Sequence, residues 1–294
     1  MTIRRALVIG GTRYFGRRLV QKLLDSGTEV TLGNRGQTPD DFGVRVKRLR
    51  FNREDAEAFA CAVHGHRWDV VFDQVCYSSN NALAACDALT GKTARYVHTS
   101  TLSVYEVPGP FAESAFDPLR YRLVPGGRAE VDYGEGKRQA EAAFSQTAPF
   151  PVVAVRIPIV LGPDDYTGRL VWHVNRVRDG NVIVIPRLEA EFCQISADGA
   201  AEFLHWIGGR SETGPINIAS EGVMSMGELI GHIEKATGRR AEIRSTGEPA
   251  DETPLADAES RVMVLDRARS LGVRFENLRE WLLPLIQDLA RRPR

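Results

Sequence analysis

The chain has 294 residues, with 38 basic and 38 acidic side chains and 43% hydrophobic residues. It is long enough for one large α/β domain, or for one domain with a smaller partner, and apolar enough to bury a core. The balanced charge argues against a nucleic-acid-binding protein that uses a broad positive face. No apolar run approaches the roughly 18–20 residues of a membrane span, so we expect a protein that does not cross a membrane.

The four cysteines are scattered along the chain without a Cys-x-x-Cys pair. This usage fits a cytoplasmic protein with reduced thiols. Cys61, His64 and His66 lie close together in the sequence, but no fourth ligand is nearby. We therefore interpret them as a helix end and turn and predict no metal site.

Short β-rich runs alternate with helical patterns in the first half of the chain. The strands are predicted at 6–9, 29–32, 44–51, 69–72, 95–99 and 152–160. The helices between them are predicted at 17–26, 56–63, 81–89 and 136–145. This alternation is typical of a parallel sheet with crossover helices, and the near-continuous apolar run 152–160 suits the centre of such a sheet.

The regular alternation ends beyond Gly162. Further helices are predicted at 169–178, 198–207, 225–237, 266–271 and 277–290, and strands at 182–186 and 215–219. The α/β pattern predicts a Rossmann-like doubly wound parallel sheet for residues 1–162 plus roughly 195–220. Residues 163–194 plus 221–294 are expected to form a smaller C-terminal α/β substrate-binding domain.

The first strand runs directly into Gly10-Gly11-Thr12-Arg13-Tyr14-Phe15-Gly16, and a helix follows at once. Glycines let the chain turn tightly and let backbone N–H groups approach a pyrophosphate at the helix N-terminus. Strand, glycine turn and helix in this order predict a dinucleotide site. The alternative is an ordinary glycine-rich turn in a fold that binds something else. Arg13 stands where a further glycine is common and adds a cation beside the phosphates.

The second strand leads into Asn34-Arg35-Gly36. An acidic residue at this place would bind the ribose 2′-OH of NAD, whereas an arginine accommodates the 2′-phosphate of NADP. There is no carboxylate here, and Arg35 and Arg13 are both within reach. The sequence therefore favours NADP over NAD; the alternative is that Arg35 is solvated or stacks on the adenine without preference.

Tyr133 and Lys137 lie four residues apart at the start of a predicted helix, so both project from one face. Oxidation of a secondary alcohol by hydride transfer needs a base, and an isolated tyrosine, with a pKa of about 10, is a poor one at neutral pH. A neighbouring ammonium favours the phenolate. Upstream, the strand 95–99 opens into a loop with hydroxyl side chains, including Ser100 and Thr101, that could hold the substrate oxygen.

These motifs, in this order, resemble the extended short-chain dehydrogenase/reductase superfamily, and within it the NAD-dependent epimerase/dehydratase group. The matching segments are Gly10 to Gly16, Ser100-Thr101 before Val104-Tyr105, Glu113 before Pro118, Tyr133-Gly134 with Lys137, Arg156-Ile157-Pro158, Val160-Leu161-Gly162-Pro163 and Asn217-Ile218. The resemblance covers about the first 220 residues well and the last 70 loosely.

The resemblance implies that Tyr133 is the acid/base and that Thr101 is the partner of the substrate hydroxyl, with Ser100 as the alternative if the register is off by one. Lys137 would favour the phenolate and hold the nicotinamide ribose. The implied cofactor site includes the glycine turn, Asn34, Arg35, Asn52, Arg53, Lys137 and Pro158. The implied substrate is a sugar or nucleotide sugar, the implied activity that of a reductase or an epimerase, and a homodimer is compatible with the family.

Two departures from the family pattern matter. The Gly-Gly-Thr-Arg-aromatic-x-Gly turn, with Asn34-Arg35-Gly36, resembles a subgroup that includes the chloroplast stem-loop-binding proteins. A catalytically idle RNA-binding or regulatory protein is therefore the alternative function, although the balanced charge speaks against nucleic acid. Leu102-Ser103 replaces the Asp-Glu of sugar-nucleotide 4,6-dehydratases, so dehydration is not expected. Arg169, Trp172 and Gln194 are candidates for substrate selection by position alone.

Overall fold

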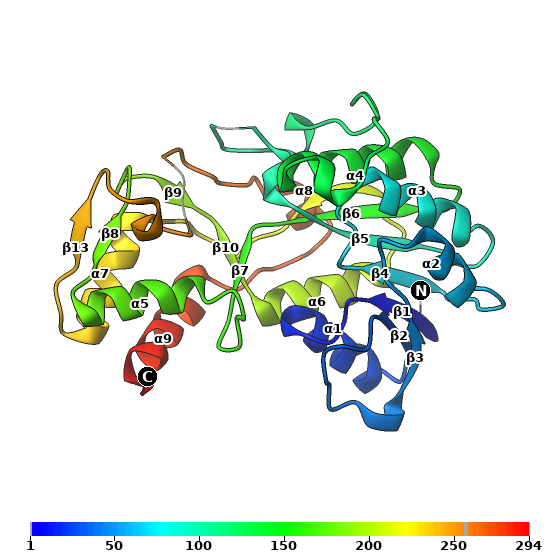
Figure 1. Ribbon diagram of the computed structural model, residues 1–294, viewed down its shortest axis with the longest axis horizontal. Helices are drawn as coiled ribbons and strands as arrows, with labels where there is room; N and C mark the ends of the chain where they lie inside the picture. The colour runs from blue at the N-terminus through cyan, green and yellow to red at the C-terminus, as the bar shows by residue number, and fades with distance from the viewer. Residues whose placement is uncertain (1, 107, 256–257, 294) are drawn as a thin grey trace. The chain divides into compact units, whose positions relative to one another are not determined.

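The computed structural model describes residues 2–106, 108–255 and 258–293 (Figure 1). The chain forms two compact units. Unit 1 is composed of Met1–Tyr105, Glu113–Ile157 and Ala200–Ile218, and unit 2 of Glu106–Ala112, Pro158–Gly199 and Ala219–Arg294. The short segment Glu106–Ala112, which was expected in the first domain, is therefore part of unit 2.

Unit 1 contains a seven-stranded sheet in the order β11-β6-β5-β4-β1-β2-β3. Its strands are β1 (Arg5–Ile9), β2 (Glu29–Asn34), β3 (Val46–Arg50), β4 (Val70–Asp73), β5 (Tyr96–Thr101), β6 (Val152–Ile157) and β11 (Gly214–Asn217). All neighbouring strands are parallel, which confirms the predicted doubly wound sheet. The strand order reverses between β1 and β4, and sheets of this kind bind ligands beyond the carboxyl ends of such strands.

Helices cover both faces of this sheet (Figure 1). Helices α2 (Ala56–Ala62), α3 (Ser79–Ala88) and α4 (Tyr133–Thr147) lie on one face, and α1 (Tyr14–Asp25) and α6 (Ala197–Gly208) on the other. Short 3-10 helices are found at η1 (Gly43–Arg45), η2 (Leu102–Val104), η3 (Glu113–Ala115) and η4 (Arg128–Glu130). The side chains of Asp55, Ser78 and Asp132 accept hydrogen bonds from the backbone three residues later, and these caps fix where α2, α3 and α4 begin.

The strand predicted over residues 152–160 is wrong in its length. Strand β6 ends at Ile157, and β7 (Ile159–Leu161) pairs with β10 (Gln194–Ser196) in a separate two-stranded sheet. Pro158 lies at the break and has no N–H group to donate to a continuous ladder. The apolar run therefore crosses from unit 1 to unit 2 at this proline.

Unit 2 is built around three helices, α5 (Arg169–Asp179), α7 (Met226–Thr237) and α9 (Leu278–Arg291), which bury Val174, Ile233 and Ile286 in a common core. The smaller elements are β8 (Val182–Val184), β9 (Glu191–Phe192), β12 (Met224–Ser225), β13 (Glu242–Arg244), η5 (Pro249–Asp251) and α8 (Asp266–Ser270). In the described part of the chain, no helix combines the length and the apolar character that a bilayer span requires.

Candidate functional site

The glycine turn after β1 approaches the first residues after β4 closely. A Cβ atom at Gly10 would lie 2.9 Å from Cγ1 of Val75, and one at Gly16 would lie 2.3 Å from Oε1 of Gln74. Gly10 also has a φ of 96°, which favours glycine. Gly11 is closed in by core side chains, where a Cβ would come within 2.6 Å of a neighbour. The turn thus lies at the reversal point of the sheet, and these close contacts explain why glycine stands at positions 10, 11 and 16.

The substitution of the middle glycine by Arg13 leaves the turn intact. Arg13 has an extended backbone, with φ −132° and ψ 153°, so a glycine is not required there. The left-handed conformation is taken instead by Tyr14, with a φ of 54°. Helix α1 begins at Tyr14 and has no acidic residue in its first turn, so its N-terminus is suited to an anion. Thr12 and Phe15, the other predicted contacts, are half-buried beside it.

The carboxyl ends of β2 and β3 present two arginines to solvent. Asn34 is used locally, because its Oδ1 accepts a hydrogen bond of 2.7 Å from the N–H of Gly36. Arg35 is exposed, and Arg50 lies opposite Asn34 at the end of β3 and is also exposed. A Cβ at Gly36 would be 3.1 Å from Nε of Arg50. Arg50 was missed from the sequence alone, although its place at the end of the adjacent strand could have signalled it.

The first carboxylates after β2 are already paired with arginines. Arg48 contacts Asp40 at 2.8 Å, and Arg17 forms a salt bridge with Asp41. The hydrogen bonds from Arg48 lower the pKa of Asp40 below its usual range. These acids are therefore engaged by Arg17 and Arg48, whereas Arg35 has no ion pair among the described residues.

Asn52 and Arg53, both expected in the cofactor site, differ in placement. Asn52 is exposed after β3, and its Oδ1 accepts a 3.3 Å hydrogen bond from the N–H of Glu54. Arg53 is buried: its Nε donates to Asp73 at 3.0 Å and its NH2 to the carbonyl of Asn81 at 2.7 Å. The predicted role of Arg53 in cofactor binding has no support in the placement of its side chain, which stabilises the interior of unit 1.

Tyr133 and Lys137 both lie near a third residue, the aromatic Tyr77. Tyr133 is the first residue of α4, is 53% exposed, and has its ring centroid 6.1 Å from that of Tyr77. Lys137 is buried one turn later, and its Nζ donates to the carbonyls of Cys76 and Thr99, each at 2.8 Å. The same Nζ lies 4.6 Å from the Tyr77 ring. Tyr77 was not identified from the sequence, because no motif includes it.

Two glycines let the start of α4 come close to the loops after β4 and β5. A Cβ at Gly134 would lie 2.8 Å from the carbonyl oxygen of Ser103, and one at Gly136 would lie 2.4 Å from that of Tyr77. Both neighbours are backbone atoms, which cannot move aside as side chains do. The two glycines therefore set the position of Tyr133 and Lys137 relative to the end of β5.

The two candidate hydroxyl groups at the end of β5 point to different partners. The Oγ1 of Thr101, a buried residue at the carboxyl end of β5, accepts a 3.1 Å hydrogen bond from the N–H of Ser103. The hydroxyl of Ser100 donates to the buried carboxylate of Glu141 at 2.5 Å. Ser100 is thus engaged inside the molecule, and Thr101 is the better candidate for a substrate contact. Leu102, which follows, is buried and carries no acidic group.

The three candidates for substrate selection, which lie in unit 2, each have different surroundings. Arg169 lies at the start of α5, 3.4 Å from the hydroxyl of Thr167. Trp172 stacks under the guanidinium of Arg176 at 4.6 Å. Gln194 is fully buried, and its side-chain amide has no hydrogen-bond partner among the described residues. Within the described ranges, no group of three or more His, Cys, Asp or Glu side chains could hold a metal ion.

Comparison with known proteins gives one family and several structural relatives. The profile of the NAD dependent epimerase/dehydratase family matches residues 6–219. The chloroplast stem-loop binding protein of 41 kDa b of Arabidopsis thaliana is 24% identical over 254 residues, which are 80% of this chain and 64% of that protein. The chain therefore spans less than two thirds of the length of this relative.

The similar solved structures include two UDP-glucose 4-epimerases. The enzyme of Thermotoga maritima, solved with UDP-glucose, has 16% identity and a TM-score of 0.76, with 98% of each chain covered. The enzyme of Thermus thermophilus, solved with NAD, has 19% identity and a TM-score of 0.71, with 98% of this chain and 99% of that chain covered. At these identities, the likeness shows a shared fold.

Proposed function

This chain belongs to the NAD dependent epimerase/dehydratase family, and from that premise we propose that it is an NAD(P)-dependent reductase or epimerase. It would act on a secondary hydroxyl or ketone of a sugar or nucleotide sugar. The observation that carries the proposal is the placement of Tyr133 and Lys137 on one turn of α4. Lys137 donates a hydrogen bond to the carbonyl of Thr99, two residues before Thr101 in β5.

The residues of unit 1 fit a dinucleotide. Gly10 and Gly16 let the turn pack tightly, because a Cβ at either position would clash with Val75 or Gln74. The N-terminus of α1 offers N–H groups and no acidic side chain, which suits a pyrophosphate. The proposed contacts are the turn from Gly10 to Gly16, Asn34, Arg35, Asn52, Lys137 and Pro158, to which Arg50 is added. The exposed Arg35 and Arg50 support NADP in preference to NAD, because a 2′-phosphate would find two cations there.

When bound, the dinucleotide supplies the hydride acceptor or donor. In the oxidative direction Tyr133 would take the proton of the substrate hydroxyl as the carbon gives up its hydride, leaving a carbonyl group. Thr101 would hold the reacting oxygen, and the Lys137 ammonium would stabilise the phenolate. Reduction is the reverse, and an epimerase would return the hydride to the opposite face. Leu102 and Ser103 offer no carboxylate for water elimination, which argues against a dehydratase.

We further propose that unit 2 carries the groups that select the substrate, with Arg169, Trp172 and Gln194 as candidates. The test of the function is a panel of nucleotide sugars incubated with NAD⁺ or NADP⁺. Products are separated by chromatography, and reduced dinucleotide is followed by its absorbance. A product whose formation is lost in Gly16→Val supports the proposal; Gly231→Ala, at an open position of α7, is the matched control. No product with any sugar, despite tight dinucleotide binding, would contradict it.

A second candidate function, RNA binding, is favoured by the similarity to the chloroplast stem-loop binding protein. The zero net charge opposes it, because RNA affinity depends on phosphate neutralisation. Filter binding of a stem-loop RNA over a salt series separates the two functions. An affinity that falls steeply with salt would favour RNA binding, and we expect none above background.

A further inference from the structure

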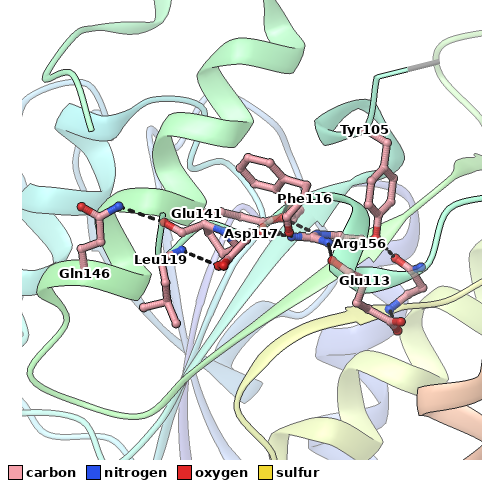
Figure 2. A network of polar contacts seen from close by, with 11 residues as sticks. Tyr105, Glu113, Phe116, Asp117, Leu119, Glu141, Gln146 and Arg156 are labelled. Atoms are coloured by element: carbon pink, nitrogen blue, oxygen red, sulfur yellow. Dashed lines mark hydrogen bonds and ion pairs between the residues drawn. The ribbon is translucent and has the colours of Figure 1, made fainter. Parts of the chain in front are cut away.

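A buried ion pair lies behind the end of β5 in unit 1. Arg156 of β6 and Glu141 of α4 are both fully buried, and the shortest contact between their side chains is 2.7 Å (Figure 2). Nε of Arg156 also lies 3.1 and 3.2 Å from the two carboxylate oxygens. Glu141 is one helical turn beyond Lys137 on α4. The acidic member of the pair thus lies on the same helix as the proposed acid/base.

The remaining N–H groups of Arg156 reach the segment after β5. NH1 donates to the hydroxyl of Tyr105 at 2.9 Å and to the carbonyl of Glu113 at 2.8 Å, and NH2 donates to the carbonyl of Phe116 at 3.0 Å. With Glu141, these acceptors satisfy all five N–H groups of the guanidinium. Figure 2 shows the guanidinium at the centre of these contacts.

The network extends to β11. The hydroxyl of Tyr105 donates to Oδ1 of Asn217 at 2.6 Å, and the N–H of Asn217 donates to the carboxylate of Glu113 at 2.9 Å. Burial raises the pKa of Tyr105 to about 12, so its hydroxyl stays protonated and can accept from Arg156 while donating to Asn217. Tyr105, Glu113, Glu141, Arg156 and Asn217 are called the Arg156 network below.

Four members of this network lie at or next to points where the chain passes from one unit to the other. The chain passes from one unit to the other after Tyr105, before Glu113, after Ile157, before Ala200 and after Ile218. Tyr105 and Glu113 border two of these passages directly, and Arg156 and Asn217 each precede the last residue before another. Four of the five passages are therefore held to one guanidinium, directly or through Tyr105 and Glu113.

The same network reaches the proposed catalytic residues. Ser100 donates to Glu141 and immediately precedes Thr101. The carboxylate of Glu141 therefore has two partners. One is Ser100, next to Thr101 at the end of β5, and the other is Arg156, which binds the residues at the chain passages. A buried ion pair contributes little net stability compared with apolar side chains of the same size, so its directional bonds are the feature to explain.

We propose that Glu141, Arg156 and Tyr105 are positioning residues, which tie the presentation of Thr101 to the points where the chain leaves unit 1 for unit 2. The catalytic part of this inference rests on the proposed function. Removal of one link should then reduce turnover without weakening dinucleotide binding, because the glycine turn and its arginines lie at other strands. It should also make the backbone at the chain passages open more often, so that amide hydrogen exchange there becomes faster.

The central variant is Tyr105→Phe, which keeps the ring and removes the hydroxyl that joins Arg156 to Asn217. Tyr121→Phe is the matched control, because the hydroxyl of Tyr121 also binds α4, through Glu135 at 2.7 Å, but lies outside the network. We expect Tyr105→Phe to lower kcat about tenfold, with dinucleotide Kd unchanged. Hydrogen exchange of the Tyr105 and Asn217 amides should accelerate about tenfold, and that of β1 should not change. Tyr121→Phe should behave as wild type in all three measurements.

A second variant separates positioning from stability. Glu141→Leu combined with Arg156→Met fills the same space without charge, so the protein should fold and bind dinucleotide. We expect its kcat to fall at least as far as that of Tyr105→Phe, and exchange at the passages to rise. Wild-type kcat in this double variant, or unchanged exchange in both variants, would overturn the proposal. If wild type turns over no nucleotide sugar, the proposed function fails, and the exchange measurement alone decides whether the network holds the passages.

Discussion

Three arginines at the carboxyl ends of strands of the same sheet have opposite environments. Arg35, which follows β2, and Arg50, the last residue of β3, are exposed, and neither has an ion pair with another described residue. Arg156, in β6, is fully buried and has acceptors for all five N–H groups. In the proposed function, Arg35 and Arg50 offer their charge to a ligand phosphate, whereas Arg156 uses its charge inside the protein. The contrast is between the proposed cofactor site and the proposed positioning network.

The contrast also predicts different effects when an exposed or a buried arginine is replaced. Removal of an exposed arginine should leave folding stability almost unchanged, but a bound phosphate would lose a charge-assisted contact. A buried arginine that loses its carboxylate leaves an uncompensated charge in the interior. Changes at the two places should therefore appear in different measurements.

The largest expected effect comes from breaking the buried pair on one side. Glu141→Gln keeps the shape of the side chain but removes the charge that balances Arg156. We expect a loss of about 3–5 kcal/mol in the free energy of unfolding, measured by denaturant titration. The double variant Glu141→Leu with Arg156→Met should lose much less. Equal losses in the two variants would mean that packing, not charge, governs this site.

The features of the proposed site are local in the sequence, whereas those of the Arg156 network are not. Strand, glycine turn and helix are local, as is the four-residue spacing of Tyr133 and Lys137, so their placement follows from short-range geometry. The partners of Arg156 come from positions 105, 113, 116 and 141, which only the folded sheet and helix bring together. The continuous apolar run on both sides of Pro158 indicated a single strand, although the chain breaks there between β6 and β7. The resemblance placed Arg53 in the cofactor site, and its burial depends on Asp73 from a different segment of the chain.

A buried titratable group without a counter-charge should respond to pH. His173 in unit 2 lies 2.8 Å from the carbonyl of Arg169 and 2.8 Å from the hydroxyl of Thr253, which suits a neutral ring that donates from Nδ1 and accepts at Nε2. Burial lowers the pKa of His173 to about 4. In the unfolded chain its pKa is about 6.5, so the unfolded state binds more protons between these values.

The stability that this neutral histidine provides is therefore present above about pH 6.5 and is lost as the pH falls toward 4. We expect the loss to be about 3 kcal/mol between pH 7 and pH 4. Denaturant titrations of wild type and His173→Gln at both pH values give the difference, and the variant cancels the contributions of other groups. An equal pH dependence in the two proteins would show that His173 titrates normally.

The smallest expected effect concerns the exposed arginines. Arg35→Ala should weaken NADPH binding at least tenfold, because a charge-assisted phosphate contact contributes about 1.5–3 kcal/mol, and leave NADH binding almost unchanged. Arg50→Ala should act in the same direction. Arg120→Ala is the control, because that arginine is 91% exposed and lies outside the proposed cofactor site. Fluorescence titration gives both affinities. Equal losses for NADH and NADPH, or a wild-type preference for NADH, would show that the pair does not select the phosphate.

The most direct test of the proposed chemistry is the turnover of Tyr133→Phe, with dinucleotide affinity measured in the same preparation. The substitution removes the phenolic oxygen and keeps the ring beside Tyr77. We predict that kcat on the substrate found in the nucleotide-sugar panel falls by about 10²–10⁴ while dinucleotide Kd is unchanged, because proton transfer is lost and the glycine turn is intact. Normal turnover by Tyr133→Phe would contradict the assignment of Tyr133 as the acid/base.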